Sequence, residues 1–314
     1  MPVRSLRASD LSADVMGGVY EVMARCHDEA SPGEPHRSRA EAEGYLRHPP
    51  GAEARDYWID EANGHCVGFA QLGVLEGSQA GYVAILVHPD ARRRGSGTAL
   101  LAAVREQAQA RGAAKLFGDH AIEAGARFAA DAGASELQRV VRSLLRLPLT
   151  ATSEAVPGYR LQSWAGPAPD TLLDSYAAAR NAINDAPGFD EDPAVWTPAF
   201  VRDLETVVAR RDREMRITVA LDERGEVAAF TELRVTRTPG ATASTEDTAV
   251  MPEHRRRGLA RWVKVESLLR LQQDRPDVRL ATTSNAEENR AMLELNRALG
   301  FVPVAVRTTS LLQV

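Results

Sequence analysis

Two stretches of the sequence, 163 residues apart, place three arginines and a glycine where an apolar run gives way to a helical pattern. Glycine lets a ligand approach the backbone, and the first turn of a helix offers unpaired N–H groups and the positive end of its dipole. We therefore expect an anion site at each strand-to-helix corner. The first corner reads Val87-His88-Pro89-Asp90-Ala91-Arg92-Arg93-Arg94-Gly95-Ser96-Gly97-Thr98, and the second reads Val250-Met251-Pro252-Glu253-His254-Arg255-Arg256-Arg257-Gly258-Leu259-Ala260-Arg261.

The repetition separates these corners from ordinary tight turns. A single glycine corner has a steric explanation, but two copies share the same Val-x-Pro lead and the same arginine triplet. Neither copy is a Walker loop, because no Gly-Lys-Ser/Thr follows, and neither is the Gly-x-Gly-x-x-Gly dinucleotide fingerprint. The pattern indicates a duplicated chain with one ligand corner in each half.

The composition is that of a globular protein with room for two domains. The chain has 314 residues, of which 44% are hydrophobic and 26% charged, and its net charge of −5 argues against nucleic acid as a partner. No apolar run reaches the roughly 18 residues that a membrane span needs, and the first residues lack a secretory pattern, so we expect a cytoplasmic protein. Cys26 and Cys66 form neither a disulfide framework nor a metal-ligand spacing, and we expect no metal.

The order of elements predicts an α/β layer fold. The run 81–87 is apolar at nearly every position, which indicates a strand covered on both faces. The first half is expected to follow the order β-α-α-β-β-β-α-β-α-β. Its expected helices are 12–30, 36–46, 95–110 and 120–132, and its expected strands include 57–59, 67–74, 81–87, 114–118 and 136–147.

The second half is expected to repeat this plan after a turn-rich linker at 149–158, which divides the chain into domains 1–150 and 159–314. Its expected helices are 170–183, 196–210 and 258–273, and its expected strands include 159–164, 215–221, 226–236 and 242–250.

These motifs resemble the GNAT superfamily of acyl-CoA-dependent N-acyltransferases. In that family an Arg/Gln-x-x-Gly-x-Gly/Ala loop holds the coenzyme A pyrophosphate on backbone amides. The resemblance implies two tandem GNAT-like domains, each with a mixed, mostly antiparallel sheet flanked by helices. The two-domain plan is similar to that of actinobacterial tandem acetyltransferases such as the mycothiol synthases, and the match is strongest from Tyr159 onward.

The second half also carries a segment similar to the family's Asn-x-x-Ala-x-x-x-Tyr-x-x-x-Gly-Phe pattern. By that resemblance, Asn285 and Asn289 contact the pantetheine side of coenzyme A, and the tyrosine position protonates the leaving thiolate. Asn296 stands at the tyrosine position, which leaves water or a weak amide donor as the acid. The alternative is that these asparagines only cap and hydrogen-bond the helix.

Three carboxylates are candidates for the base. Strand alternation in 242–250 places Ser244, Glu246 and Thr248 on one face and Asp247 on the other. Relatives that use a strand glutamate would carry it at Ser244, so Glu246 is the first candidate, Asp247 the second and Glu232 the third. Each of these side chains could equally be an exposed or ion-paired carboxylate, and water could also deprotonate the amine.

The first half keeps its glycine corner but has lost the rest of the pattern. Its strand 81–87 contains no acid, and the segment after His120 lacks the asparagine and the tyrosine, with Phe128 and Gly133 as remnants. His120 could act as a base, although a histidine at a helix start is more often a capping or surface residue. We expect a partly degenerate N-terminal domain that still binds acyl-CoA and a catalytic C-terminal domain.

The resemblance implies transfer of an acyl group from acetyl-CoA, or another acyl-CoA, to the amine of a small molecule. We expect direct attack in a ternary complex, because neither cysteine is placed to carry an acyl group. The acidic stretch 184–193 would suit a cationic acceptor, or is simply a solvated loop. A catalytically weak acyl-CoA-binding protein and a protein acetyltransferase are the alternatives. The expected assembly is a monomer or homodimer, with a role in specialised metabolism or resistance.

Overall fold

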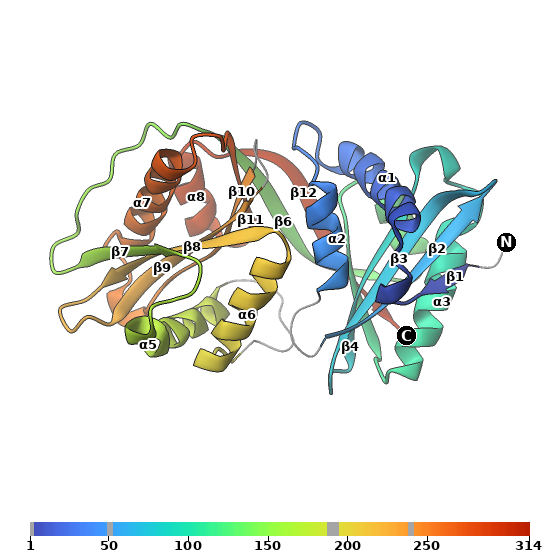
Figure 1. The fold of residues 1–314 in the computed structure, drawn as a ribbon, viewed down its shortest axis with the longest axis horizontal. Coiled ribbons are helices and arrows are strands. Elements are labelled where there is room, and N and C mark those ends of the chain that lie inside the picture. Colours follow the sequence, from blue (N-terminus) through green and yellow to red (C-terminus); the bar gives the residue numbers. More distant parts are fainter. Residues whose placement is uncertain (1–2, 49–52, 187–194, 238–241) are drawn as a thin grey trace. The chain divides into compact units, whose positions relative to one another are not determined.

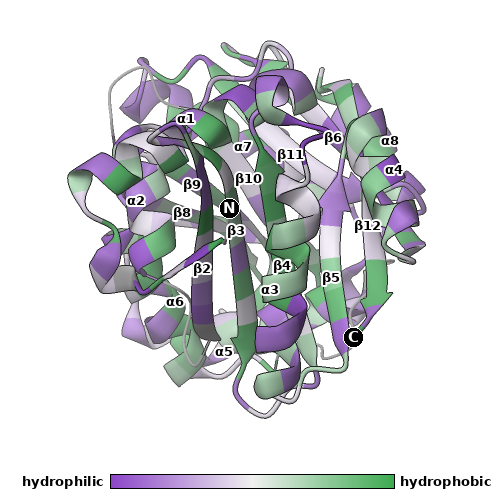
Figure 2. Cartoon of the chain, turned by 90° about the vertical axis from the view of Figure 1, so that its right-hand side faces the viewer, coloured by the Kyte–Doolittle hydropathy of each residue, from purple (hydrophilic) through white to green (hydrophobic). Residues whose placement is uncertain are grey.

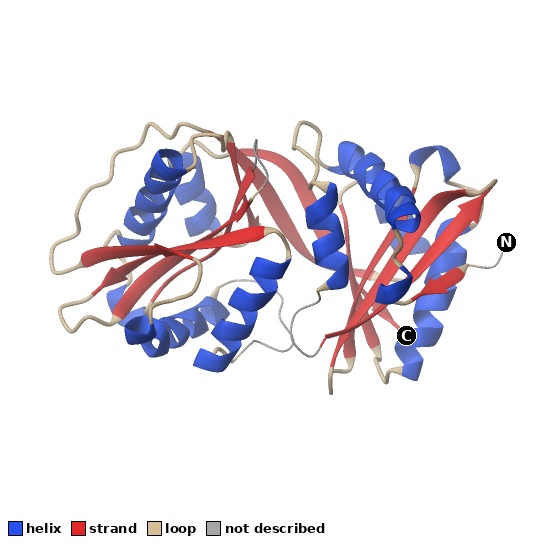
Figure 3. Cartoon of the chain, in the orientation of Figure 1, coloured by secondary structure: helices blue, strands red, loops and turns tan. Residues whose placement is uncertain are grey.

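The computed structural model describes residues 3–48, 53–186, 195–237 and 242–314, and it divides the chain into two compact units. Unit 1 comprises Met1–Arg139 together with Ala305–Val314, and unit 2 comprises Val140–Val304. Each unit is a sheet of strands between helices, as Figures 1 and 3 show. This arrangement confirms the expected α/β class.

Unit 1 contains a six-stranded sheet in the order β1-β2-β3-β4-β5-β12. Neighbouring strands are antiparallel except β4 and β5, which are parallel. Its strands are β1 (Arg4–Leu6), β2 (Glu53–Ala62), β3 (His65–Leu75), β4 (Ala80–Val87), β5 (Lys115–His120) and β12 (Val302–Gln313). Its helices are α1 (Ala13–Ala30), α2 (Arg39–Arg47), α3 (Ser96–Ala110) and α4 (Glu123–Asp131), with short 3-10 turns η1 (Ala8–Asp10) and η2 (Pro89–Ala91).

Unit 2 repeats this sheet in the order β6-β11-β10-β9-β8-β7. Here β10 and β11 form the parallel pair, and the other neighbours are antiparallel. Its strands are β6 (Ser135–Arg146), β7 (Arg160–Ala165), β8 (Arg213–Leu221), β9 (Val227–Thr236), β10 (Thr242–Val250) and β11 (Leu280–Ala286). Its helices are α5 (Asp170–Arg180), α6 (Pro198–Arg210), α7 (Leu259–Asp274) and α8 (Arg290–Ala298), with 3-10 turns η3 (Asn181–Asp185) and η4 (Pro252–His254).

The last strand of each sequence half completes the sheet of the other unit. β12 pairs with β5, from Thr308 opposite His120 to Gln313 opposite Lys115. β6 pairs with β11, where Arg146 lies opposite Leu280. The compact units therefore differ from a division into 1–150 and 159–314, because each sheet takes its closing strand from the other half.

Side-chain alternation builds a core on each face of both sheets. In β2, Tyr57 and Ile59 pack with α1 and α2, whereas Trp58 packs with α3. In unit 2, α5 and α6 cover one face of β8 and β9, and α7 covers the other. Figure 2 shows the hydrophobic colouring along β3, whose buried side chains belong to both cores.

Helix starts follow the capping chemistry of the sequence. The Ser12 hydroxyl accepts from the Val15 amide, and Ser38 forms a reciprocal capping box with Glu41. Thr197 caps α6, whose first residue is Pro198. These caps place the starts of α1, α2 and α6 within three residues of the expected positions.

The expectation that 81–87 is covered on both faces is wrong for most of β4. Tyr82 is 55% exposed, and the residues that follow it are only half-buried. β4 pairs with β5 only from Ala80 to Tyr82, so its later residues lose a neighbouring strand. Apolar composition therefore overstated the burial of this strand.

In the described part of the chain, no helix has the length and apolarity that crossing a bilayer requires.

A lysine lies inside the core of unit 2. Lys264 on α7 is 2% exposed, and its Nζ lies 5.7 Å from the centroid of the Phe301 ring. Leu101 stands at the same distance after the first glycine corner and belongs to the apolar core of unit 1. Burial lowers the pKa of Lys264 to about 7.

We predict that Lys264→Leu stabilises the protein most at pH 7 and below. In the unfolded chain the lysine keeps its proton up to its usual pKa of about 10.4, whereas in the folded protein it does so only up to about 7. Burying this lysine therefore destabilises the folded protein fully below pH 7, and the destabilisation disappears as the pH rises from 7 to 10. The wild type should gain up to about 1.4 kcal/mol per pH unit relative to the variant between pH 7 and 10. Urea unfolding of both proteins across this range measures the difference. A difference that does not change with pH would contradict the prediction.

Candidate active site

The parallel strands of unit 2 separate halfway along their length. β10 pairs with β11 from Thr242 opposite Leu280 to Thr245 opposite Thr283, and no pairing follows for Glu246–Val250. The backbone N–H and C=O groups of Glu246–Val250 that face β11 are therefore left for another hydrogen-bond partner. Because the second glycine corner follows directly after β10, the gap leads to that corner.

A β-bulge interrupts β10 at the same place. The register with β9 shifts between Thr245, which lies opposite Leu233, and Thr248, which lies opposite Thr231. Regular alternation would place Ala243 and Ala249 on the same face of the sheet. Instead Ala243 packs with residues of α7, whereas Ala249 packs with residues of α5 and α6, because the extra residue reverses the alternation. The expectation of uninterrupted alternation is therefore wrong.

The bulge directs Glu246 and Asp247 toward the same face of the sheet. Asp247 contacts Arg180 on α5, and Glu246 lies near Arg213 at the start of β8, on the face that carries Met215. An extra residue in a strand turns a pair that would point apart into neighbours on one side. This is how both strand acids reach the α5–α6 side.

Arg180 is the centre of a buried ionic cluster. Its side chain is 1% exposed, and its two terminal nitrogens donate to Glu232 Oε2 at 2.6 Å and Asp247 Oδ2 at 2.7 Å. It also donates to the Tyr176 hydroxyl at 2.8 Å, and its guanidinium carbon lies 3.7 Å from the centroid of the Trp196 ring. Arginine suits this place because its planar fork can bind two carboxylates and stack on an aromatic ring at once.

Two further arginines complete the cluster. Arg234 Nε donates to Glu232 Oε1 at 2.6 Å, and Arg213 Nη1 lies 3.9 Å from Glu246 Oε1. Three guanidiniums thus face three carboxylates, and the charges balance when all six groups are ionised. All three carboxylates singled out in the sequence, Glu232, Glu246 and Asp247, lie in this cluster.

The carboxylates of the cluster differ in their readiness to bind a proton. Burial tends to raise the pKa of Glu232, but Arg234 and Arg180 outweigh burial and lower it. Burial raises the pKa of Asp247 to about 6, helped by the charges of Glu232 and Glu246 against the opposing effect of Arg180. The side chain of Glu232 is fully buried, whereas that of Asp247 is 33% exposed. Asp247 is therefore the carboxylate of this pair that a ligand can reach.

Arg180, Arg234 and Trp196 were not identified from the sequence as site residues. One signal was available, because Leu172, Tyr176 and Arg180 recur at four-residue spacing on the buried face of α5. An arginine on an apolar helical face needs an acidic partner, since an unpaired buried charge is costly. The sequence did not indicate which acid that partner would be.

The two glycine corners adopt the same backbone geometry. Arg93 and Gly95 have φ of +63° and +93°, and Arg256 and Gly258 have φ of +60° and +86°. Each glycine is the N-cap of its helix, α3 or α7, where the first amides have no partner inside the helix. Alternating left-handed residues before a helix form an anion-binding concavity. Both corners thus present free amides at a helix start in the same geometry.

The first arginine of each triplet holds the corner to its strand. Arg92 Nε donates to the Val87 carbonyl at 3.2 Å, and Arg255 Nε donates to the Val250 carbonyl at 3.1 Å. Arg92 also pairs with Glu29, and Arg255 pairs with Asp185 at 2.5 Å. These two side chains support the loops and are not directed only at a ligand.

The remaining corner residues fall into structural and open positions. Ser96 and Leu259 are buried at the helix starts. Arg257 donates to the Tyr159 hydroxyl at 2.8 Å, and the same hydroxyl lies 2.8 Å from His254 Nδ1. Arg94 and Thr98 are exposed, and Gly97 and Ala260 are half-buried. Arg261 donates to the Thr152 carbonyl at 3.5 Å.

Buried polar atoms without partners lie in unit 2 at the strands and helix that flank the gap. Asn296 Nδ2 donates to Asn285 Oδ1 at 2.7 Å, and Asn289 caps α8 through the Met292 amide. Among the described residues, Asn296 Oδ1 and Thr245 Oγ1 are buried and have no hydrogen-bond partner. Such groups are costly unless a ligand or water satisfies them.

Unit 1 has the corner but not the cluster. β3 and β4 pair without a register shift from Gly68 opposite Val87 to Val74 opposite Gly81, so β4 has no bulge. His120 Nε2 lies 3.2 Å from Ser310 Oγ of β12. Cys26 and Cys66 are free and half-buried, and burial raises the pKa of both thiols, that of Cys66 to about 11.

Most of the acidic stretch 184–193, which was expected to form an acceptor wall, is not among the described residues. Residues 187–194 lie outside the described residues. Asp185, at the end of η3, pairs with Arg255 of the corner. Within residues 3–48, 53–186, 195–237 and 242–314, no group of three or more His, Cys, Asp or Glu residues could hold a metal ion.

We predict that Arg180→Met destabilises the protein by roughly 3–5 kcal/mol at pH 7, because Glu232 and Asp247 would both lose the buried arginine that they share. The loss should shrink as the pH falls and Glu232 binds a proton. Urea unfolding measures it. Arg270→Met is the matched control, since Arg270 pairs with Glu266 on the surface of α7 and should cost below about 1 kcal/mol. A similar cost for both variants would contradict the buried role of Arg180.

Comparison with known proteins agrees with this geometry. The model of the acetyltransferase (GNAT) family matches residues 18–129 and 178–301, which is most of the chain in two copies. Each match includes one glycine corner, the strand before it (β4 or β10) and the parallel strand after its helix (β5 or β11). The family model therefore describes each half separately.

Among curated proteins, mycothiol acetyltransferases of Mycolicibacterium paratuberculosis and Mycobacterium avium are 40% and 39% identical to this chain over 111 residues. The matched part is 34% of this chain and 34% of each relative. The chain thus matches about a third of the length of these relatives.

Among solved structures, a tandem GNAT protein from the clavulanic acid biosynthesis pathway superposes with a TM-score of 0.87 at 29% identity, covering 99% of this chain and 98% of that one. A GCN5-related N-acetyltransferase from Sphaerobacter thermophilus has a TM-score of 0.70 at 20% identity, covering 99% and 95%, and shows the fold alone. Two family matches, two glycine corners and a tandem neighbour over the whole chain lead to one conclusion: the chain belongs to the GNAT family of acetyltransferases and has its tandem two-domain form.

Proposed function

We propose that unit 2 transfers an acetyl group from acetyl-CoA to the amine of a small molecule, by direct attack in a ternary complex. The observation that carries the proposal is the partly exposed Asp247, held by Arg180 beside the opening between β10 and β11. GNAT proteins generally use acetyl-CoA, and the relatives named above are acetyltransferases.

The coenzyme would be held by groups along the gap of unit 2. The amides that follow Gly258 would bind the pyrophosphate, since helix starts favour anions. The buried acceptors Thr245 Oγ1 and Asn296 Oδ1 would receive N–H groups of the pantetheine chain. In this arrangement Asn285 and Asn289 position Asn296 and the start of α8.

The coenzyme supplies an acetyl thioester: the amine nitrogen bonds to the carbonyl carbon, the carbon–sulfur bond breaks, one proton leaves the nitrogen and one reaches the thiolate. The chain must hold the two reactants together and accept the proton from the amine. Holding them in line can account for several kcal/mol of the barrier. Neither free thiol is poised to carry the acetyl group, because burial raises the pKa of both Cys26 and Cys66.

Asp247 is the best-placed base. Its pKa of about 6 leaves it ionised at neutral pH yet close enough to that pH to exchange protons. Glu232 is fully buried between Arg180 and Arg234, so we assign it a positioning role. Glu246 is 27% exposed and turned toward Arg213, which makes it the second candidate.

Asn296 is unsuited to protonating the thiolate. It is buried, and its amide already donates to Asn285. An amide is a poor acid, and its open atom is the acceptor Oδ1. We therefore assign the proton for the thiolate to water and give Asn296 a binding role.

Unit 1 would bind acyl-CoA through its corner without supporting transfer. Gly95 has the same left-handed geometry as Gly258, but β4 lacks both the bulge and an acidic residue. The catalytic group is therefore proposed for unit 2 alone.

We predict that Asp247→Asn lowers kcat by about 10²–10⁴-fold and removes the acidic limb of the pH profile, because the variant cannot accept the amine proton. In the wild type, kcat/KM should rise with a midpoint near pH 6 as Asp247 loses its proton. Thiol release from acetyl-CoA, measured with a panel of small amines between pH 5 and 9, tests both statements.

The matched control is Glu246→Gln, which changes the neighbouring carboxylate of the same bulge and should keep the limb near pH 6. Thermal melting confirms that both variants are folded. Loss of the limb in Glu246→Gln and its survival in Asp247→Asn would assign the base to Glu246. Acetyl-CoA binding without thiol release for any amine would favour a binding protein over an enzyme.

A further inference from the structure

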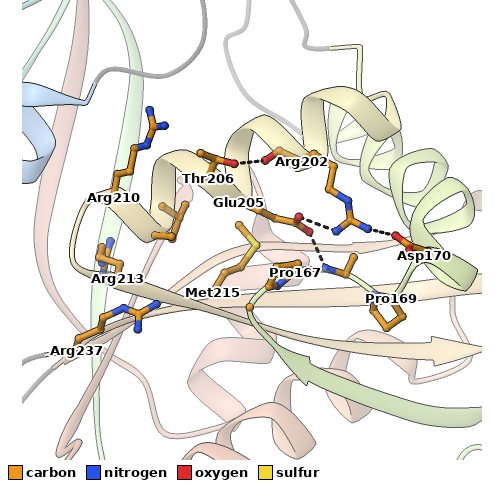
Figure 4. Close-up of a pocket in the computed structure, with 14 residues that line it drawn as sticks. Pro167, Pro169, Asp170, Arg202, Glu205, Thr206, Arg210, Arg213, Met215 and Arg237 are labelled. Atoms are coloured by element: carbon orange, nitrogen blue, oxygen red, sulfur yellow. Dashed lines mark hydrogen bonds and ion pairs between the residues drawn. The ribbon is translucent and has the colours of Figure 1, made fainter.

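A cavity of about 860 Å³ lies in unit 2 beside the ionic cluster, between the segment that joins β7 to α5, the C-terminal half of α6 and the start of β8. Its middle is apolar, with Met215, Val208 and Pro167 among the lining residues. Figure 4 shows Arg210, Arg213 and Arg237 at one end and the Arg202 ion pairs at the other.

The two ends of this cavity differ in charge. Arg202 is neutralised, because it pairs with Glu205 at 2.8 Å and with Asp170 at 2.5 Å. In the ranges that the structure describes, Arg210 and Arg237 have no ion-pair partner and are exposed to solvent. Four arginines and two carboxylates line the cavity, although the whole chain carries a net charge of −5. The positive charge is therefore local to one end.

Arg213 connects the cavity with the proposed catalytic group. It lines the cavity, and its Nη2 donates to the Arg234 carbonyl at 3.1 Å. Its Nη1 lies 3.9 Å from Glu246 Oε1, and Glu246 precedes Asp247 in the bulge. The cavity and the carboxylate cluster thus share one side chain.

We propose that this cavity binds the far end of the acceptor and that this end carries an anionic group, a carboxylate or a phosphate. Guanidinium groups bind both of these anions through paired hydrogen bonds, and the apolar middle would contact the connecting carbon chain. The amine would then point toward Asp247. This inference rests on the proposed function, because it assigns the acceptor of the same site.

The test compares acceptors that differ only in their far end. The full chain is given acetyl-CoA with 6-aminohexanoate or 6-aminohexanamide, and with 2-aminoethyl phosphate or ethanolamine. The wild type should prefer the anionic member of a pair by about tenfold in kcat/KM. A preference within the first pair alone identifies a carboxylate, and one within the second pair alone identifies a phosphate.

Arg237→Gln and Arg210→Gln should each raise KM for the preferred anionic amine by up to about tenfold and leave kcat and the neutral amine unchanged. Arg224→Gln is the control, since Arg224 lies in the turn between β8 and β9 and does not line the cavity. The inference would be overturned if the wild type used the anionic and the neutral amine of each pair equally well. It would also be overturned if the arginine variants lost the same activity with the anionic amine as with the neutral one.

A binding measurement separates this inference from the proposed function. Calorimetric titration with hexanoate and with inorganic phosphate needs no turnover, and Arg237→Gln should weaken the binding of whichever anion binds. Binding that depends on Arg237, combined with no thiol release for any amine, would keep the cavity and reject the transferase. Absence of both anion binding and anion preference would overturn the cavity as an acceptor site.

Discussion

The separation of β10 from β11 after Thr245 is the constraint on which the site in unit 2 depends. Two parallel strands that stayed paired would leave no open backbone beside the glycine corner. The bulge at the same position turns Glu246 and Asp247 to one face, so that one irregularity both ends the pairing and presents the acids. The left-handed Gly258 then starts α7 with its free amides at the end of the same strand.

The acids that the bulge presents are stable there only because of arginine. Arg180 divides its nitrogens between Glu232 and Asp247, and Arg234 takes the other oxygen of Glu232. Burial raises the pKa of Asp247, and Arg180 only partly opposes this effect, whereas Arg234 and Arg180 together outweigh the burial of Glu232 and lower its pKa. Unit 1 has the same corner and the same parallel strands, but a regular β4 with no acid. The two units therefore differ in chemistry more than in fold.

Much of the fold could be predicted from the sequence. Caps, apolar periodicity and the duplicated corners located the elements within a few residues, because these signals are local. Three features depend on contacts that periodicity cannot show. The exchange of β6 and β12 is a pairing between distant segments, the bulge at Glu246 breaks the alternation that the prediction assumed, and Arg180 gains its role only from partners on β9 and β10. The carboxylates were found as candidates, but their shared arginine was not.

The central claim is that the coenzyme used for transfer lies in unit 2. Calorimetry with acetyl-CoA, followed by thiol release with an amine that the wild type accepts, tests this claim in Gly258→Glu and Gly95→Glu. Each substitution puts a negative charge and a side chain at a left-handed glycine of one corner. The account predicts that Gly258→Glu loses one binding site and all transfer, while Gly95→Glu keeps transfer. Transfer that survives in Gly258→Glu and disappears in Gly95→Glu would place the active site in unit 1 and contradict the account.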